Sequence, residues 1–360
     1  MYYRLANKVG IFLDESYEEK YGAMGMDVLA ETITADQFSL CVSTLSIHYT
    51  NKSNHQDCNE EGEYYYSGAR FVDPRLGVCI EKKSESRYSI HANQECLEWF
   101  MCMLEIVLLK AKMTFVHCAA IEKNGKTLFL PARGGVGKTA TVAKMIREHG
   151  WHLLCDDLLL LDGEDCGVYS YHKKFVIYGY HKNLFPELFS ERKSPIKNKA
   201  INHVLGKMIP TAKKVLRKVP GLLAVARENN PMQMRVYPKD IFEPEQLAYH
   251  TEGISETIWL ERTAAADVTL KNCSAEEIAS RCAAVTMSEL TYGSMNLNSC
   301  LFTMCGSGML DYSEIYAQIY QIILDCVCGT SPKVLGIPRD VPVEEVYERV
   351  YETTSIKGES

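Results

Sequence analysis

Eight residues in the first half of the chain carry its clearest chemical signal. Residues 132–139 are Ala-Arg-Gly-Gly-Val-Gly-Lys-Thr, between the apolar run Thr127–Leu130 and a helix-like stretch over residues 140–146. A strand, a glycine-rich turn and the start of a helix are the context of a phosphate-binding P-loop. The glycines let backbone N–H groups surround phosphate oxygens, and the helix start adds partial positive charge. The pattern therefore predicts a nucleotide-binding protein.

Each part of this turn has an expected role. Lys138 is expected to reach the β and γ phosphates, and the Thr139 hydroxyl to hold Mg²⁺. Ala132 replaces the first glycine of the pattern, and alanine fits there only with a negative φ. The alternative interpretation is a glycine-rich turn that binds nothing. The residues expected to surround the nucleotide phosphates are Ala132, Arg133, Gly134, Gly135, Val136, Gly137, Lys138, Thr139 and Ala140.

A pair of aspartates follows the P-loop at a short distance. Asp156 and Asp157 end an apolar, strand-like run that begins at Trp151, and nineteen positions separate Lys138 from Asp157. A kinase needs a phosphate cradle, a lysine, a metal and a base near the acceptor hydroxyl. We expect Asp156 to position Mg²⁺ and Asp157 to accept the hydroxyl proton. The alternative is a plain pair of metal-site aspartates in a nucleotide hydrolase.

A histidine precedes the P-loop in a second strand-like run. His117 lies within the apolar residues 115–121, and Asn124-Gly125 separates them from the strand that enters the P-loop. Asn-Gly between apolar runs predicts a β-hairpin. The hairpin would bring His117 close to the phosphates, where it could contact the γ phosphate or orient Asp157. The alternative is a core histidine whose ring is satisfied by backbone groups.

The remaining chain must supply the elements that position these residues. Residues 1–93 are expected to form a small β-rich module, and residues 94–360 a P-loop domain. Together they predict an α/β fold. The expected strands outside the hairpin include Val9–Leu13, Phe38–Val42, Gly77–Ile80, Trp151–Cys155 and Ile254–Leu260. The expected helices are residues 94–112, residues 275–286 with Ser274 as N-cap, and residues 313–326.

The order of these motifs resembles a known family. His117, the Asn-Gly hairpin, the P-loop and the paired aspartates are arranged as in the catalytic domain of HPr kinase/phosphorylase, whose nucleotide fold is similar to that of phosphoenolpyruvate carboxykinase. The resemblance covers residues 117–157 specifically and continues diffusely to about residue 335. It implies a mixed sheet with flanking helices, ATP as donor and Mg²⁺ as cofactor. The family's catalytic histidine falls on His117, its phosphate-binding lysine on Lys138, its Mg²⁺-binding hydroxyl on Thr139 and its proton acceptor on Asp157, with Asp156 alongside.

The chain departs from this family at two places. The family's Glu-x-Arg-Gly segment, which supplies a further metal ligand, would lie near residues 176–179, where no acid or arginine occurs. The family's later catalytic arginine has only Arg235 and Lys239 as candidates for an acceptor or phosphate contact. These departures argue against HPr itself as the acceptor. They are similar to those of divergent HPr-kinase-like proteins in peptide-modifying gene clusters, such as lasso-peptide kinases.

The charge distribution bears on the acceptor. The chain has a net charge of −7, yet residues 191–227 contain ten Lys and Arg residues and one acid. Apolar residues at helical spacing predict an ordered helical insert there. The insert could dock an acidic acceptor, or it could be a solvated helix face.

Composition limits the class of protein. With 46% hydrophobic and 24% charged residues, the chain is typical of a globular protein, and we expect neither a signal peptide nor a membrane span. Its fourteen cysteines lack Cys-x-x-Cys spacing, which argues against a zinc site and favours a reducing cytoplasm. We therefore expect a cytoplasmic ATP-dependent kinase whose partner is a protein, peptide or small-molecule acceptor and not nucleic acid. The alternatives are a P-loop NTPase that drives a partner's conformational change by hydrolysing ATP or GTP, and a non-catalytic nucleotide-binding scaffold. A homo-oligomer is left open.

Overall fold

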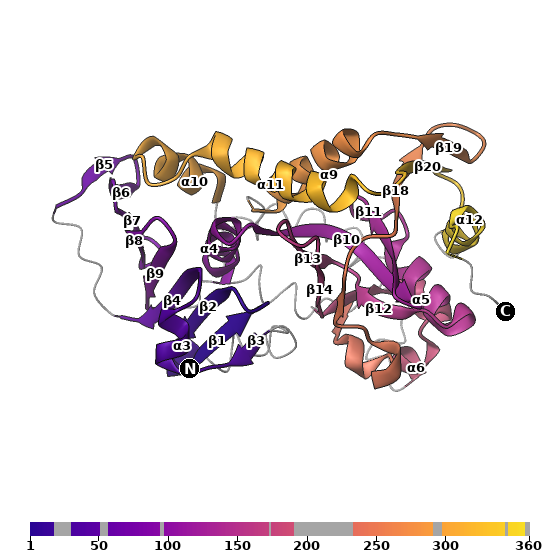
Figure 1. The fold of residues 1–360 in the computed structure, drawn as a ribbon, viewed down its shortest axis with the longest axis horizontal. Coiled ribbons are helices and arrows are strands. Elements are labelled where there is room, and N and C mark those ends of the chain that lie inside the picture. The colour runs from indigo at the N-terminus through magenta and orange to yellow at the C-terminus, as the bar shows by residue number, and fades with distance from the viewer. Residues whose placement is uncertain are drawn as a thin grey trace, which may run out of the picture.

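The structure of the protein is a computed structural model. It describes residues 1–17, 30–50, 57–93, 97–172, 174–190, 233–290, 297–342 and 345–356. The basic segment at residues 191–227, for which we predict a helical insert, lies outside the described residues. Within them the chain is a mixed α/β protein with two large sheets and several helices (Figure 1). No helix in this part of the chain is long and apolar enough to cross a bilayer.

The first sheet comes from the N-terminal residues. Its strand order is β3-β1-β2-β4-β9-β8-β7-β6-β5. The strands are β1 (Tyr2–Leu5), β2 (Val9–Leu13), β3 (Ala30–Thr32), β4 (Ser43–Tyr49), β5 (Asn59–Glu61), β6 (Tyr64–Ser67), β7 (Arg70–Asp73), β8 (Val78–Ser84) and β9 (Arg87–Ala92). Helix α4 (Leu97–Lys110) packs against β4 and β9, and Trp99 and Phe100 of this helix are fully buried. The strand predicted at residues 9–13 is confirmed, and the helix predicted over residues 94–112 is confirmed over Leu97–Lys110.

The strand predicted over Phe38–Val42 is wrong. Residues Ala35–Ser39 form the short helix α3, and β4 begins only at Ser43. A capping box at Thr34 and Gln37 starts this helix: the Thr34 hydroxyl accepts the Gln37 N–H, and the Gln37 side chain accepts the Thr34 N–H at 2.9 Å. Two reciprocal hydrogen bonds therefore outweigh a strand-like run of apolar residues.

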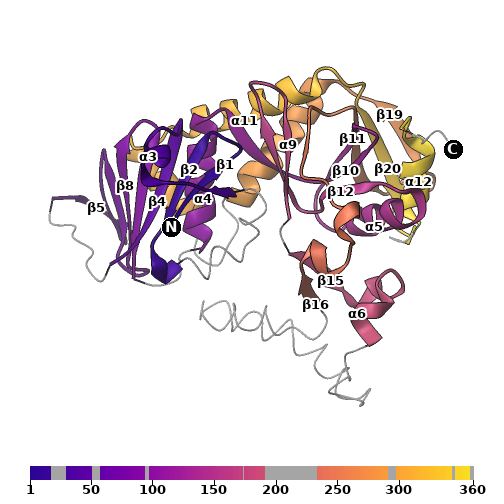
Figure 2. The ribbon, with the colours of Figure 1, turned by 60° about the horizontal axis from the view of Figure 1, so that its bottom comes forward.

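The second sheet carries the predicted site. Its order is β17-β14-β13-β10-β11-β18-β20-β19, with β12 also paired to β10. The strands are β10 (Met113–Lys123), β11 (Lys126–Pro131), β12 (His152–Cys155), β13 (Leu158–Asp162), β14 (Val168–Tyr171), β17 (His250–Thr251), β18 (Glu256–Thr263), β19 (Thr269–Asn272) and β20 (Lys333–Pro338). A separate pair, β15 (Phe175–Tyr178) and β16 (Gln233–Val236), extends away from it near α6 (Pro186–Ser190) (Figure 2).

The predicted hairpin is confirmed. Strands β10 and β11 pair antiparallel with Lys123 opposite Lys126, so Asn124 and Gly125 form a two-residue loop. Their φ values are 53° and 76°, as the hairpin turn that favours Asn-Gly requires. Strand β12 pairs with the other edge of β10, so β10 separates the strand that precedes the aspartates from the strand that enters the P-loop.

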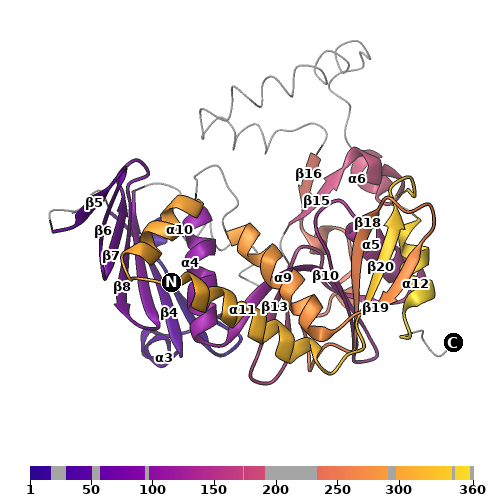
Figure 3. The same ribbon diagram turned by 90° about the horizontal axis from the view of Figure 1, so that it is seen from above.

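Helices cover both faces of the second sheet. Helices α9 (Ala275–Leu290) and α11 (Tyr312–Val327) pack on one face of β10, and α5 (Lys138–His149) packs on the other, with α12 (Val346–Thr353) beside it. Helices α9 and α11, with α10 (Leu297–Gly306), extend from one sheet toward the other (Figure 3). One hydrophobic cluster contains buried side chains of the first sheet, of α4 and of the α9–α11 face of the second sheet.

Candidate active site

The segment predicted to be a P-loop, residues 132–139, leaves the end of β11 and leads into helix α5. Ala132 is fully buried, forms a parallel bridge with Leu260 and does not have a positive φ, so alanine fits at this position. Gly135 and Gly137 have φ values of 80° and 111°, a conformation that favours glycine. A Cβ added at Gly134 or Gly135 would meet no atom of the described chain within 4 Å. The outer side of the loop is therefore open to a ligand.

Lys138 is held inside this loop. Its Nζ lies 3.1 Å from the Ala132 and Arg133 carbonyl oxygens and 3.0 Å from Nε2 of His117. Burial lowers the pKa of Lys138, and the charges of Asp156 and Asp157 oppose that effect. Three acceptors thus fix the ammonium group at the mouth of the loop, at the start of α5.

Thr139 and Asp156 form the next contact. The Thr139 hydroxyl donates to Oδ2 of Asp156 at 2.7 Å. The other oxygen, Oδ1, is buried and has no hydrogen-bond partner among the residues that the structure describes. Burial raises the pKa of Asp156 to about 7. A hydroxyl beside a carboxylate with one unsatisfied buried oxygen is a donor set that fits a hard cation.

His117 connects Lys138 to Asp157. Its Nδ1 lies 3.4 Å from Oδ1 of Asp157 and 4.0 Å from Oε1 of Glu289. A lysine ammonium can only donate, so Nε2 of His117 accepts from Lys138 and the ring proton belongs on Nδ1, facing the carboxylates. The Cys118 N–H donates to the Asp157 carbonyl at 3.2 Å, which fixes the turn between β12 and β13 against β10 at this point. His117 is therefore part of a polar network and is not satisfied by backbone alone.

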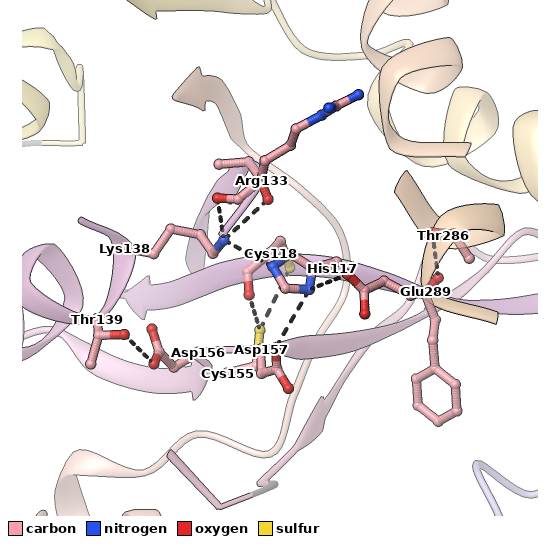
Figure 4. Close-up of polar contacts among 12 residues, drawn as sticks. His117, Cys118, Arg133, Lys138, Thr139, Cys155, Asp156, Asp157, Thr286 and Glu289 are labelled. Carbon is pink, nitrogen blue, oxygen red and sulfur yellow. Dashed lines mark hydrogen bonds and ion pairs between the residues drawn. The ribbon is translucent and has the colours of Figure 1, made fainter. Parts of the chain in front are cut away.

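Five predicted site residues thus lie together (Figure 4). His117 comes from β10, Lys138 and Thr139 from the first turn of α5, and the two aspartates from the turn between β12 and β13. The Arg133 side chain points away from Lys138 in the same view. Glu289 is not among the residues predicted from the sequence. It arrives on α9 from far along the chain and belongs to no local motif, so only tertiary packing reveals it.

The remaining predicted positions lie on the β15–β16 pair and just after it. Arg235 is exposed on β16 and is the cross-strand neighbour of Val176, so it lies beside the segment from which the family's acid and arginine are missing. Lys239 is exposed in the 3-10 turn Pro238–Asp240, with its ammonium 5.5 Å from the centre of the Tyr237 ring. Their contact with acceptor or phosphate stays a prediction.

The described residues contain no cluster of three or more His, Cys, Asp or Glu side chains that could hold a metal ion. Mg²⁺ is commonly bound by one or two protein oxygens together with phosphates of the substrate, and seldom by a cage of protein ligands alone. Thr139 and Asp156 match this smaller donor set.

Comparison with models of known protein families finds none that matches this chain, and comparison with curated proteins finds no match either. No family is assigned on this basis. The contacts around Lys138 therefore carry the functional argument.

Proposed function

We propose that the protein is a Mg²⁺-dependent kinase with an HPr-kinase-like P-loop fold, which transfers the γ-phosphoryl group of ATP to a hydroxyl group. The observation that supports this most is one contact network around the start of α5. It joins Lys138 to His117, His117 to Asp157, and Thr139 to Asp156. Phosphoryl transfer depends mainly on positioning and on charge neutralisation, so a fixed cation, a metal-binding pair and a base beside one phosphate cradle are the parts that it needs.

The donor end of the site would bind the triphosphate. The backbone N–H groups of residues 134–139 would surround the phosphate oxygens, and the positive end of α5 would face them. Lys138 already lies at the loop mouth, and it would exchange its contacts with carbonyl oxygens and His117 for phosphate oxygens. Because its ammonium is largely buried, its attraction to phosphate is less screened by water than that of a surface lysine.

Thr139 and Asp156 would hold Mg²⁺ against the phosphates. When bound, the cation offsets the negative charge on the β and γ phosphates. Binding a cation would also favour the ionised form of Asp156, whose pKa burial raises to about 7 in the ligand-free protein.

Asp157 would act at the acceptor end. The acceptor oxygen would form a bond to the γ phosphorus while the bond to the β–γ bridging oxygen breaks and ADP leaves. The hydroxyl proton would pass to the Asp157 carboxylate, which His117 orients through Nδ1. Asp157 and Glu289 have side chains 33% and 47% exposed, so an acceptor can reach this side of the network.

The same accessibility favours one second candidate, a P-loop NTPase in which water takes the place of the acceptor. Incubation with ATP labelled at the γ phosphate, Mg²⁺ and a library of Ser- and Thr-containing peptides separates the two. A kinase yields an acid-stable phosphoester on the acceptor, detected by mass spectrometry. Release of free phosphate at the same rate with and without peptides would instead identify a hydrolase.

A further inference from the structure

A cavity of about 610 Å³ opens beside the P-loop, on the side away from the catalytic carboxylates. Strand β11 has β10, with His117, on one side and β18 on the other. The cavity lies against the end of β18 and against α9, and Arg133, Gly134 and Val136 of the P-loop form part of its wall. A space of this size is typical of sites for small molecules. One ligand could therefore occupy this cavity and place a phosphate chain on the loop.

The floor of the cavity is a fixed flat surface. The Arg281 guanidinium lies 5.4 Å from the centre of the Trp259 ring. Its two Nη atoms donate to Glu261 at 2.9 Å and to Glu277 at 2.6 Å. The indole below is 5% exposed. Two carboxylates and an aromatic face therefore hold the plane of Arg281 in place.

Two of the three arginines that line the cavity are already engaged by other groups of the protein. The charge on Arg281 is offset by the Glu261 and Glu277 carboxylates that flank it. Arg262 donates from Nη1 to the carbonyl oxygens of Pro338 and Val341 at 2.9 and 2.7 Å, so backbone groups hold its guanidinium in place. Apolar side chains complete the wall: Val136, Leu260, Ala284 and Val285. A flat ring with polar edges fits the apolar wall and the guanidinium plane of Arg281, and it leaves Arg133, the third arginine of the lining, on the P-loop side of the cavity.

We propose that this cavity binds the base of the donor nucleotide, a subsite that rests on the proposed function. The base would stack on the Arg281 guanidinium, as bases do on arginine planes. An exocyclic amino group on the base would donate to Glu261 at the rim of the cavity. Arg133, whose side chain points away from Lys138, would lie between the base and the phosphates (Figure 4).

The test compares ATP with inorganic tripolyphosphate, which has the phosphates but no base. Ala284 is exposed on α9 and lines the cavity, so Ala284→Phe fills the space without disturbing the core. Ala266 is exposed in the turn after β18 and does not line the cavity, so Ala266→Phe is the matched control. Dissociation constants are measured by calorimetry in the presence of Mg²⁺, with circular dichroism to verify folding.

We expect Ala284→Phe to weaken ATP binding about tenfold or more, which is the scale of one stacked base, and to leave tripolyphosphate binding unchanged. Ala266→Phe should change neither. Arg281→Lys keeps the charge and loses the flat surface, so it should weaken ATP alone by a smaller factor. Unchanged ATP binding in Ala284→Phe, or equal losses for both ligands, would overturn the base subsite while leaving the P-loop proposal intact. Failure of the unmodified protein to bind either ligand would overturn the P-loop proposal, and the subsite with it.

Discussion

At the scale of single residues, Asp156 links stability to function. Burial raises the pKa of Asp156 to about 7, whereas an unfolded chain ionises aspartate near about 3.9. As pH rises between these values the unfolded chain loses this proton first, so the folded state loses stability and the loss is complete above the folded pKa. A buried carboxylate of this kind is kept at a cost in stability, as is common at functional sites.

Asp156→Asn should therefore stabilise the ligand-free protein. The gain in melting temperature should be clear at about pH 8 and should shrink toward about pH 4, where the folded-state carboxyl is protonated and the unfolded-state carboxyl is about half protonated. The same variant should need more Mg²⁺ to reach half of its maximal rate. A melting temperature that falls at about pH 8, or an unchanged Mg²⁺ requirement, would contradict the role given to Asp156.

Asp157→Asn should affect the rate and not the metal. It removes the proposed base, so transfer should slow by a factor on the order of 10²–10⁴ while Mg²⁺-dependent ATP binding is largely retained. Titration of Mg²⁺ against rate, beside Asp156→Asn, checks the division of labour. If Asp157→Asn shifts the Mg²⁺ titration and Asp156→Asn does not, the two roles are reversed.

The site residues differ in how far sequence can reveal them. Lys138, Thr139 and the aspartates lie in local motifs whose spacing reflects one strand, one loop and one helix. On α9, Glu289 approaches His117 and Arg281 lines the cavity beside the P-loop. This helix is recognisable from its apolar spacing, but nothing in that spacing tells which strand the helix covers. Contacts that depend on tertiary packing therefore cannot be predicted from a local sequence motif.

At the scale of elements, the β10–β11 hairpin positions the site. It aligns His117 with the P-loop, and its turn has Gly125 at φ 76° with no described atom within 4 Å of an added Cβ. Gly125→Ala should therefore cost only backbone strain, about 1–2 kcal/mol in urea unfolding, and leave ATP affinity unchanged.

Gly134, also open around its Cβ and without a positive φ, is the contrasting position. Gly134→Ala should cost little stability and weaken ATP binding. Weaker ATP binding in Gly125→Ala, together with unchanged ATP binding in Gly134→Ala, would contradict the role given to this loop.

Elements with one dominant signal were predictable, and elements with competing signals were not. The hairpin follows from Asn-Gly between two apolar runs, and α9 begins where Ser274 accepts the Glu277 N–H at 3.2 Å. The segment Phe38–Val42 has an apolar run and, just before it, a capping box, and the capping hydrogen bonds decide the structure. Leu40 and Val42 are 82% and 55% exposed, so that apolar run lacks the burial that a strand would give it.

At the scale of the whole molecule, the two sheets share one hydrophobic cluster. Trp99, Phe100 and Leu104 of α4 are fully buried, and they belong to a cluster that also includes residues of both sheets. A fragment that starts at residue 94 would expose this face of α4 to water, at a cost that scales with the apolar area uncovered. We expect the fragment 94–360 to lose cooperative thermal unfolding and ATP binding. A fragment with the melting temperature and ATP affinity of the full chain would show that the second sheet folds independently.

We propose that the network around Lys138 carries out phosphoryl transfer to a hydroxyl group. Its most direct test is the transfer of label from γ-labelled ATP to an acceptor peptide by the full chain and by Lys138→Ala. We expect labelled phosphoester with the original residue and a loss of at least about 10²-fold in the variant, because it lacks the ammonium group that would neutralise charge on the transferred phosphoryl group. The circular dichroism of the variant should stay unchanged. Equal labelling by both proteins, or release of free phosphate with no labelled acceptor, would contradict the claim.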